Sequence, residues 1–181
     1  MKRVRVRPAL IVFVLVFAQA VVGAHNAVDD SLSIQADSRP SIIETLVVDT
    51  EFTMLVDAIG FAGLVEMLAI DAPFTLLAPN DSAFARLDKE TLKRIFESRK
   101  NVKQLMAGLI ITRELEAETL LEVETVTTLD RHQMVITKQD NRLMVGDAVV
   151  ISKDIKCSNG VIHVIDTVPV PPAEEANNSI P

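Results

Sequence analysis

The chain has 181 residues, which is enough for one domain with a substantial apolar core, and its net charge is −7. It contains no Trp, no Tyr and only seven Phe, so aliphatic side chains must do most of the packing. An acidic protein repels nucleic acid, and one without Trp and Tyr has few rings on which bases or sugars can stack. The composition therefore argues against a nucleic-acid-binding protein and against a lectin.

The first 24 residues have the layout of a secretory signal peptide. A start with four Lys and Arg residues precedes an apolar stretch, and small residues end the segment at Ala24. Cleavage after Ala24, or after Ala20, would change the net charge from −7 to −11, because the segment holds no acidic residue. The alternative is an uncleaved anchor that tethers the protein to a membrane, although an apolar run of about sixteen residues is short for a full span. We expect export, with no stable membrane span after cleavage.

Residues 25–40 are polar and lack periodicity, which predicts a flexible leader. Ser41 and Glu44 then match a capping box, and they open a segment in which apolar residues recur at helical spacing. Gly60 and Gly63 are expected to break this segment into short helices joined by tight turns. The N-terminal third of the domain is therefore predicted to be helical.

A short strand is predicted at residues 74–78, and Asn80 or Asp81 can cap the turn of helix that follows it and carries Phe84. Asn80 also begins an N-glycosylation sequon, but an Asn whose side chain holds a turn is poorly exposed, so the capping role is favoured. A second sequon begins at Asn177, near the end of the chain, and is the better candidate for a glycan.

Two more helices are expected in the middle of the chain. Asp88 begins the first, and Asn101 with Gln104 forms a capping pair for the second. Residues 86–103 hold seven basic and three acidic residues, whereas residues 113–124 hold five Glu and one Arg. The basic cluster can dock an acidic partner or an anionic glycan, or it can be the solvated face of helices. Pairing of the two segments between molecules would give weak self-association.

From residue 123 onward the pattern changes to short strands with tight turns. The expected strands are residues 123–129, 134–138, 143–145, 148–151 and 161–168. Such strands imply antiparallel pairing with helices packed against one face or end of the sheet, which is an α+β arrangement. The run VIHVI at residues 161–165 is apolar on nearly every residue, so it needs cover on both faces and should be central in its sheet.

Three side chains near this closing strand are candidate functional groups. Cys157 is the only cysteine, so it cannot form an internal disulfide, and burial as a small side chain is favoured over pairing with another chain. His163 would need partners to bind a metal, and His25 and His132 show no spacing that supplies them, so a hydrogen-bonded core histidine is favoured. Asp166 is expected to satisfy backbone groups at the strand end. We expect no metal site.

Sequence motifs of enzymes are missing from the chain. There is no G-x-S-x-G elbow, no H-E-x-x-H pair and no phosphate-binding loop, and Cys157 has no evident His-Asn partnership. We therefore expect a protein that is not an enzyme and that carries no cofactor.

Three segments together resemble one family. FTLLAPNDSAF at residues 74–84 resembles the first signature of fasciclin (FAS1) domains, and SNGVIHVIDTVPVPP at residues 158–172 resembles the closing signature. LMVGDAVVISKDI at residues 143–155 is similar to the family's hairpin before the last strand. The resemblance covers residues 41–172, which leaves a tail at residues 173–181 that is expected to be disordered. The signature residues in this chain are Asn80, Phe84, Asn159, Gly160, His163 and Asp166.

The resemblance implies an α+β fold, a wedge or sandwich of short, mostly antiparallel β-strands with an N-terminal and central helical layer. It also implies a secreted, extracellular module for cell adhesion, which contacts a cell-surface receptor or matrix protein without catalysis. In periostin-like members an Asp-Ile pair before the closing signature is implicated in integrin binding, and Asp154 and Ile155 occupy that place here. The alternative is that Ile155 packs inward and Asp154 only solvates a turn.

The chain departs from the family pattern in its middle. The family's Tyr-His pair is replaced by Ala107 and Gly108, and a glycine usual a few residues later is replaced by Thr112. A second hypothesis for the function is a carrier of an apolar small molecule, a lipid or a pigment, in a groove lined by methionines. The methionines considered for such a groove are Met54, Met67, Met106, Met134 and Met144. Ordinary core packing is the simpler explanation of these methionines.

Overall fold

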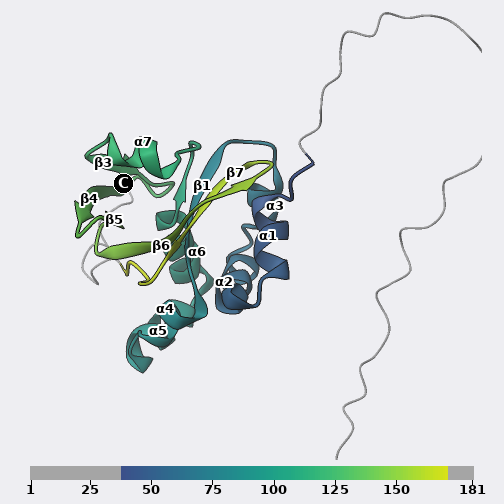
Figure 1. Ribbon diagram of the computed structural model, residues 1–181. Helices are drawn as coiled ribbons and strands as arrows, with labels where there is room; N and C mark the ends of the chain where they lie inside the picture. Colours follow the sequence, from purple (N-terminus) through teal and green to yellow (C-terminus); the bar gives the residue numbers. More distant parts are fainter. Residues whose placement is uncertain (1–37, 171–181) are drawn as a thin grey trace, which may run out of the picture. The chain divides into compact units, whose positions relative to one another are not determined.

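The computed structural model describes residues 38–170, which form an α+β domain (Figure 1). The predicted signal peptide, most of the predicted leader, the tail and Asn177 lie outside the described residues. Within the described part, the helices are α1 (Ile42–Val48), the 3-10 turn η1 (Thr50–Phe52), α2 (Thr53–Ala62), α3 (Val65–Ala69), α4 (Asp81–Ala85), α5 (Lys89–Phe96), α6 (Arg99–Gly108) and α7 (Ala117–Leu121).

The strands of the described part form one sheet of seven. They are β1 (Phe74–Pro79), β2 (Ile110–Ile111), β3 (Thr125–Thr127), β4 (Gln133–Gln139), β5 (Arg142–Val145), β6 (Ala148–Cys157) and β7 (Gly160–Ile165). Their order is β2-β1-β7-β6-β5-β4-β3. All neighbours pair antiparallel except β1 and β7, which run parallel. The amide of Leu129 donates to the carbonyl of Ile110 at 2.7 Å, which connects the loop after β3 back to β2 at the other edge.

The first helices begin where the sequence predicts. Ser41 caps α1, and the Glu44 carboxylate accepts a hydrogen bond from the Ser41 amide at 2.8 Å, so the capping box is complete. Gly63 ends α2 with φ of +72°, a conformation that glycine adopts without strain. The predicted break at Gly60 is wrong, because this residue lies inside α2.

The later helices agree less well with the prediction. Asp88 caps α5 by accepting a hydrogen bond from the Thr91 amide at 2.8 Å, as expected. The cap of α6 is Ser98, however, and not Asn101, whose side chain instead donates to the Arg94 carbonyl at 2.7 Å. Helix α7 and the two-residue strand β2 were not predicted. Strand β6 is longer than expected, because an irregular stretch lets its pairing with β7 continue to Cys157.

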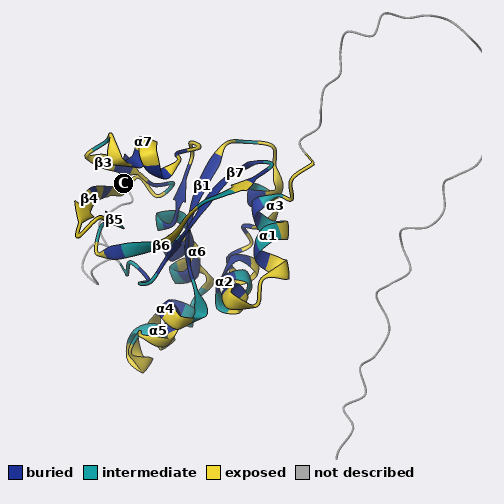
Figure 2. Cartoon of the chain, viewed as in Figure 1, coloured by how far each residue is buried: buried dark blue, intermediate teal, exposed yellow. Residues whose placement is uncertain are grey.

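The prediction that the closing strand is central in the sheet is confirmed. Strand β7 lies between β1 and β6, and all six of its residues are buried. Figure 2 shows β1 and β7 mostly buried, whereas exposed residues lie on the helices and on the outer strands β3 and β4. Helix α1 contacts β7, whereas α6 contacts β2 and α7 contacts β4, so helices pack against the sheet at its centre and near both edges.

Candidate functional site

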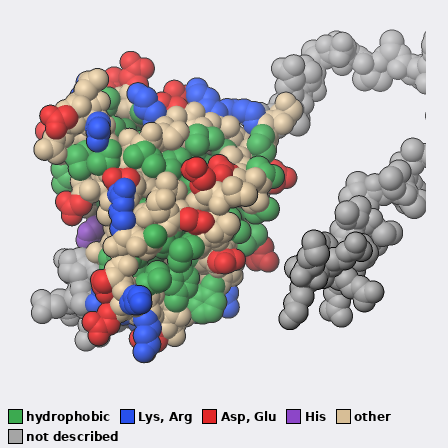
Figure 3. All heavy atoms as spheres, turned by 60° about the horizontal axis from the view of Figure 1, so that its bottom comes forward, with side chains coloured by type: hydrophobic (Ala, Val, Ile, Leu, Met, Phe, Trp, Pro, Cys, Tyr) green, Lys and Arg blue, Asp and Glu red, His purple; other side chains and the backbone are tan. Residues whose placement is uncertain are grey.

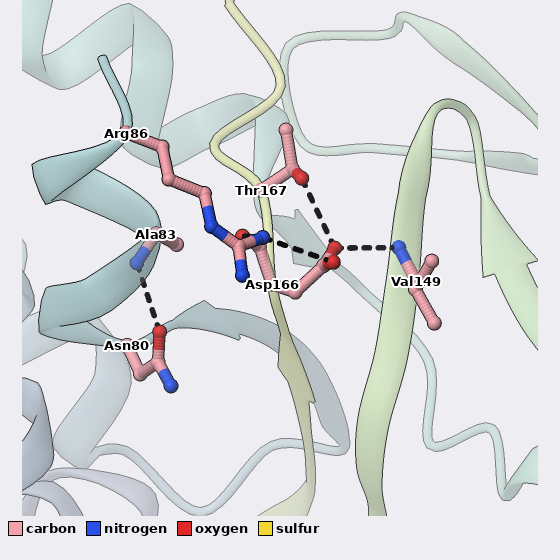
Figure 4. A network of polar contacts seen from close by, with 6 residues as sticks. All are labelled: Asn80, Ala83, Arg86, Val149, Asp166 and Thr167. Carbon is pink, nitrogen blue, oxygen red and sulfur yellow. Dashed lines mark hydrogen bonds and ion pairs between the residues drawn. The ribbon is translucent and has the colours of Figure 1, made fainter.

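The first signature segment builds the turn between β1 and α4. The Asn80 side-chain oxygen accepts a hydrogen bond from the Ala83 amide at 2.9 Å and so caps α4 (Figure 4). Phe84, one turn further, is fully buried in the core. Both signature residues therefore hold the fold, and glycosylation of the half-buried Asn80 stays a prediction.

Asp81 in the same segment caps a helix that is distant in the sequence. Its carboxylate accepts a hydrogen bond from the Met54 amide at 2.9 Å and another from the Thr53 hydroxyl. The N-cap residue of α2 is Phe52, which has no polar side chain with which to accept these bonds. The sequence predicts only a local capping role for Asp81, because the two residues that donate to its carboxylate lie 27 and 28 positions earlier in the chain.

Asp166 joins the end of β7 to β6 and to α4, as Figure 4 shows. One carboxylate oxygen accepts hydrogen bonds from the Val149 amide at 2.9 Å and the Thr167 hydroxyl at 3.0 Å. The other oxygen forms an ion pair with Arg86 at 3.1 Å, and the same guanidinium nitrogen donates to the Asp166 carbonyl at 2.8 Å. Partial burial opposes ionisation, but these bonds outweigh it and lower the pKa of Asp166. The predicted backbone contact of Asp166 is present.

Asn159 ties the N-terminal helices to the closing strand. Its side-chain oxygen accepts a hydrogen bond from the Ile42 amide at 2.9 Å. Its nitrogen donates to the carbonyls of Leu68 at 2.7 Å and Ile70 at 3.1 Å. The start of α1 and the end of α3 are thus held by one buried side chain. This explains physically why an Asn stands in the closing signature segment.

Gly160 follows at the point where β7 begins to run beside β1. Its φ is +143°, and a Cβ atom at this position would lie 2.0 Å from the backbone oxygen of Phe74. A side chain here would collide with backbone, which cannot move aside as the end of a flexible side chain can. The parallel pairing of β1 and β7 therefore requires glycine at this position.

His163 is completely buried, and both of its ring nitrogens are engaged with backbone. Nε2 lies 2.8 Å from the Leu115 carbonyl, which can only accept, so Nε2 carries the hydrogen of the neutral ring. Nδ1 accepts a hydrogen bond from the Asp154 amide at 3.3 Å. Burial lowers the pKa of His163. The hydrogen-bonded core histidine expected from the sequence is what the structure shows.

Thr75 on β1 holds the same loop from the next strand along the sheet. Its hydroxyl donates to the Arg113 carbonyl at 2.7 Å and accepts from the Leu115 amide at 2.8 Å. Thr75 is completely buried, so these bonds replace the water that its hydroxyl loses on folding. The loop before α7 is thus fixed to the sheet by Thr75 and His163.

Asp154 and Ile155, the predicted partner-binding pair, lie on the irregular stretch of β6. Asp154 has a positive φ of 59°, and its carboxylate accepts a hydrogen bond from the Ala117 amide at 2.7 Å, at the start of α7. Both residues are half-buried, and Ile155 packs against the core. Beside them, Lys156 forms an ion pair with Glu116 at 2.6 Å. Asp154 is therefore held by hydrogen bonds, and Ile155 packs inward, as the alternative interpretation of this pair expects.

Gly108, one of the positions that depart from the family pattern, lines a groove that neither residue of the Asp-Ile pair lines. This groove has a volume of about 690 Å³ and lies between α5, α6, the start of β4, the turn between β5 and β6, and the segment after β7. A Cβ atom on Gly108 would lie 3.4 Å from the carboxylate of Asp130, which lines the same groove. Of the five methionines considered for a carrier, only Met134 lines this groove, while Met106 is buried in the core.

The remaining candidate groups are structural. Cys157 is buried, its sulfur lies 3.4 Å from the Thr45 hydroxyl, and burial raises the pKa of its thiol. Within residues 38–170 there is no group of three His, Cys, Asp or Glu side chains placed to hold a metal ion. The longest helices in this part have ten residues, and none is long and apolar enough to cross a membrane.

The comparison with family models identifies the chain. Residues 50–171 match the model of the Fasciclin domain. The chain belongs to the fasciclin domain family. The predicted family is therefore confirmed, and the matched range includes the first signature segment, the hairpin and all but the last residue of the closing signature. The α+β fold class is confirmed as well, by the mixed sheet with its helices and by the structural match below.

Two similar proteins come from Synechocystis sp. An uncharacterized protein, sll1735, is 33% identical over 129 residues, which cover 71% of this chain and 96% of the relative. Protein sll1483 is 34% identical over 138 residues, which cover 75% of this chain and 76% of the relative. The matched region thus makes up most of these two relatives, and neither name states a function.

Matches to larger proteins cover only part of their length. The transforming growth factor-beta-induced protein ig-h3 of Sus scrofa is 29% identical over 150 residues, which cover 82% of this chain and 22% of the relative. A solved FAS1 domain pair from the insect cell adhesion molecule Fasciclin I matches with a TM-score of 0.59 and 16% identity, over 73% of this chain and 51% of that one. This structural likeness supports the fold alone.

Proposed function

We propose that this chain is an exported fasciclin domain that mediates adhesion through non-catalytic contacts with a cell-surface receptor or a matrix protein. The observation that carries the proposal is the hydrogen-bonded, half-buried Asp154 on β6, in a domain of a family that includes an insect cell adhesion molecule. The absence of enzyme motifs in the sequence agrees with a role in binding.

The geometry around Asp154 supports a preformed contact surface. Its amide is held by His163, its carboxylate is held by Ala117, and its neighbours Lys153 and Lys156 are exposed. A surface that is already ordered loses little conformational entropy when a partner binds. The carboxylate keeps further lone pairs with which a partner's donor or cation can interact.

Apolar contact area is available elsewhere on the surface. Val48, Phe61 and Ile70, at the ends of the first three helices, are exposed by 81%, 49% and 52%. Figure 3 shows hydrophobic side chains gathered on one face of the molecule, with acidic and basic side chains around them. Such residues supply the buried anchors of an interface. One small domain binds weakly alone, so adhesion would need several copies at a surface.

A cell-adhesion assay on immobilised protein tests the role of Asp154. We expect Asp154→Asn to reduce attachment severalfold, because the amide oxygen can still accept from Ala117 while the negative charge is lost. Asparagine also tolerates positive φ, so the fold should be retained. Asp147→Asn is the matched control, since it removes one exposed charge from the turn between β5 and β6. Equal attachment of both variants and the unchanged protein would rule out Asp154 as a contact.

Export is a separate part of the proposal with its own measurement. Mass spectrometry of the protein recovered from the medium should show an N-terminus after Ala24 or Ala20, and a glycan, if one is present, at Asn177. A product retained in the cell membrane with an intact N-terminus would support the tethered alternative instead.

A further inference from the structure

A smaller hollow lies between α7 and the strands β4, β5 and β6. Its volume is about 270 Å³, and it shares no lining residue with the larger groove. Ligand pockets usually hold roughly 300–1,000 Å³, so this hollow suits a molecule with few heavy atoms. Its lining residues combine apolar side chains with three cations, and no carboxylate is among them.

The hollow lies at one edge of the core, where buried side chains give way to a lysine on β4. Met134 and Ile136 on β4 are buried, and Lys138 is the next residue on the same face of that strand. Lys138 pairs directly with buried Leu143 of β5. Lys138 therefore occupies a position on the buried face of β4, where the alternation of buried and exposed residues along the strand predicts an apolar side chain. The apolar interior therefore ends at a lysine.

The apolar side of the hollow is unusually exposed. Leu121 of α7 and Ile151 of β6 line it and are exposed by 42% and 53%. Leu143 lines it from below as part of the core. An apolar group placed against these three side chains would remove their surface from water, which is favourable by about 25 cal/mol for each Å² buried.

The charged side of the hollow consists of Lys138, Arg142 and Lys153. Among residues 38–170, none of these three cations forms an ion pair with a carboxylate. The three cations line the hollow together, while acidic residues close to its lining residues along the chain, among them Asp140 and the Glu residues of the α7 segment, do not line it. An anion that binds here would be attracted by all three cations at short range, although salt screens them.

We propose that this hollow binds a small amphipathic anion, with an apolar chain long enough to cover Leu121, Leu143 and Ile151 and a carboxylate or phosphate head near Lys138, Arg142 and Lys153. A sulfated polysaccharide would leave the apolar side uncovered, and an uncharged lipid would leave the three cations without a counterion. The hollow adjoins the proposed adhesive contact, because Lys153 and Ala117 line it and Ala117 also holds the Asp154 carboxylate. Lys138 and Arg142 belong to the hollow alone, so variants at these two residues test it separately from Asp154→Asn.

Chemical-shift titration of the isotope-labelled full chain tests the site with matched probes. Octanoate and octyl phosphate carry both features of the ligand, butanoate has a short apolar body, and octan-1-ol has no charge. We expect saturable shifts at residues that line the hollow with octanoate or octyl phosphate, and much weaker binding of the other two. The stronger of the two anions identifies the head group. Equal binding of octanoate and octan-1-ol, or no saturable shift with either anion, would overturn the proposal.

Variants distinguish binding in the hollow from nonspecific attraction of anions to exposed cations. Lys138→Gln and Arg142→Gln should each weaken octanoate binding about two- to fivefold, the effect of one exposed charge. Lys103→Gln, an exposed cation of α6 outside the hollow, is the matched control and should leave the affinity unchanged. Ile151→Ser should weaken octanoate binding more than butanoate binding. Equal losses with Lys103→Gln and Lys138→Gln would also overturn the proposal, and unchanged amide spectra elsewhere would show that each variant is folded.

Discussion

Gly160 shows how one residue decides a strand pairing. Because a Cβ atom here would overlap the Phe74 oxygen, and because φ is +143°, we expect Gly160→Ala to lower the free energy of unfolding by about 3 kcal/mol or more. Gly60→Ala is the control: this glycine lies inside α2 with open space around it, so alanine should add about 0.5–1 kcal/mol. Urea unfolding followed by far-UV circular dichroism measures both, since the chain has no Trp or Tyr for fluorescence. A neutral Gly160→Ala would contradict the close approach of β1 and β7.

At the scale of elements, the loop before α7 depends on the neutral form of His163. The lowered pKa of His163 in the folded state means that the unfolded chain takes up a proton first as the pH falls below about 6.5. The contribution of His163 to the free energy of unfolding is therefore fully present above that pH. It decreases on acidification, by up to about 1.4 kcal/mol for each pH unit. Denaturation at pH 7.5, 6 and 5 should show this slope, and His163→Asn should lack it while being less stable at all three values. Parallel pH profiles of the two proteins would refute the assignment.

For the whole molecule, Asn159 couples the helical layer to the sheet. Asn159→Ala removes three hydrogen bonds and leaves the Ile42 amide and the Leu68 carbonyl unsatisfied, so we expect a loss of about 2–4 kcal/mol. Gln139→Ala, on the exposed end of β4, should change the stability by less than about 0.5 kcal/mol. Thermal unfolding by circular dichroism measures both. Hydrogen exchange should accelerate most in α1 and α3, and uniform exchange across the domain would argue against this coupling.

The family, the order of most elements and several helix caps could be predicted from the sequence. Ser41, Asn80 and Asp88 accept hydrogen bonds from amides three residues later, so the cap and its partner stand in one short stretch of sequence. The central position of β7 could be inferred because a strand without polar alternation must be covered on both faces. These features depend on neighbours along the chain or on burial alone.

Contacts between residues that are distant in the sequence could be determined only from the tertiary structure. Helix α7 is tied by Asp154, 37 residues after Ala117, and α2 is capped by Asp81, 27 residues after Met54. The parallel pairing of β1 with β7, the groove beside Gly108 and the hollow beside Lys138 likewise come from segments that folding brings together. The physical reason is that local patterns specify which face of an element is buried, whereas the choice of what covers that face depends on the packing of the whole domain.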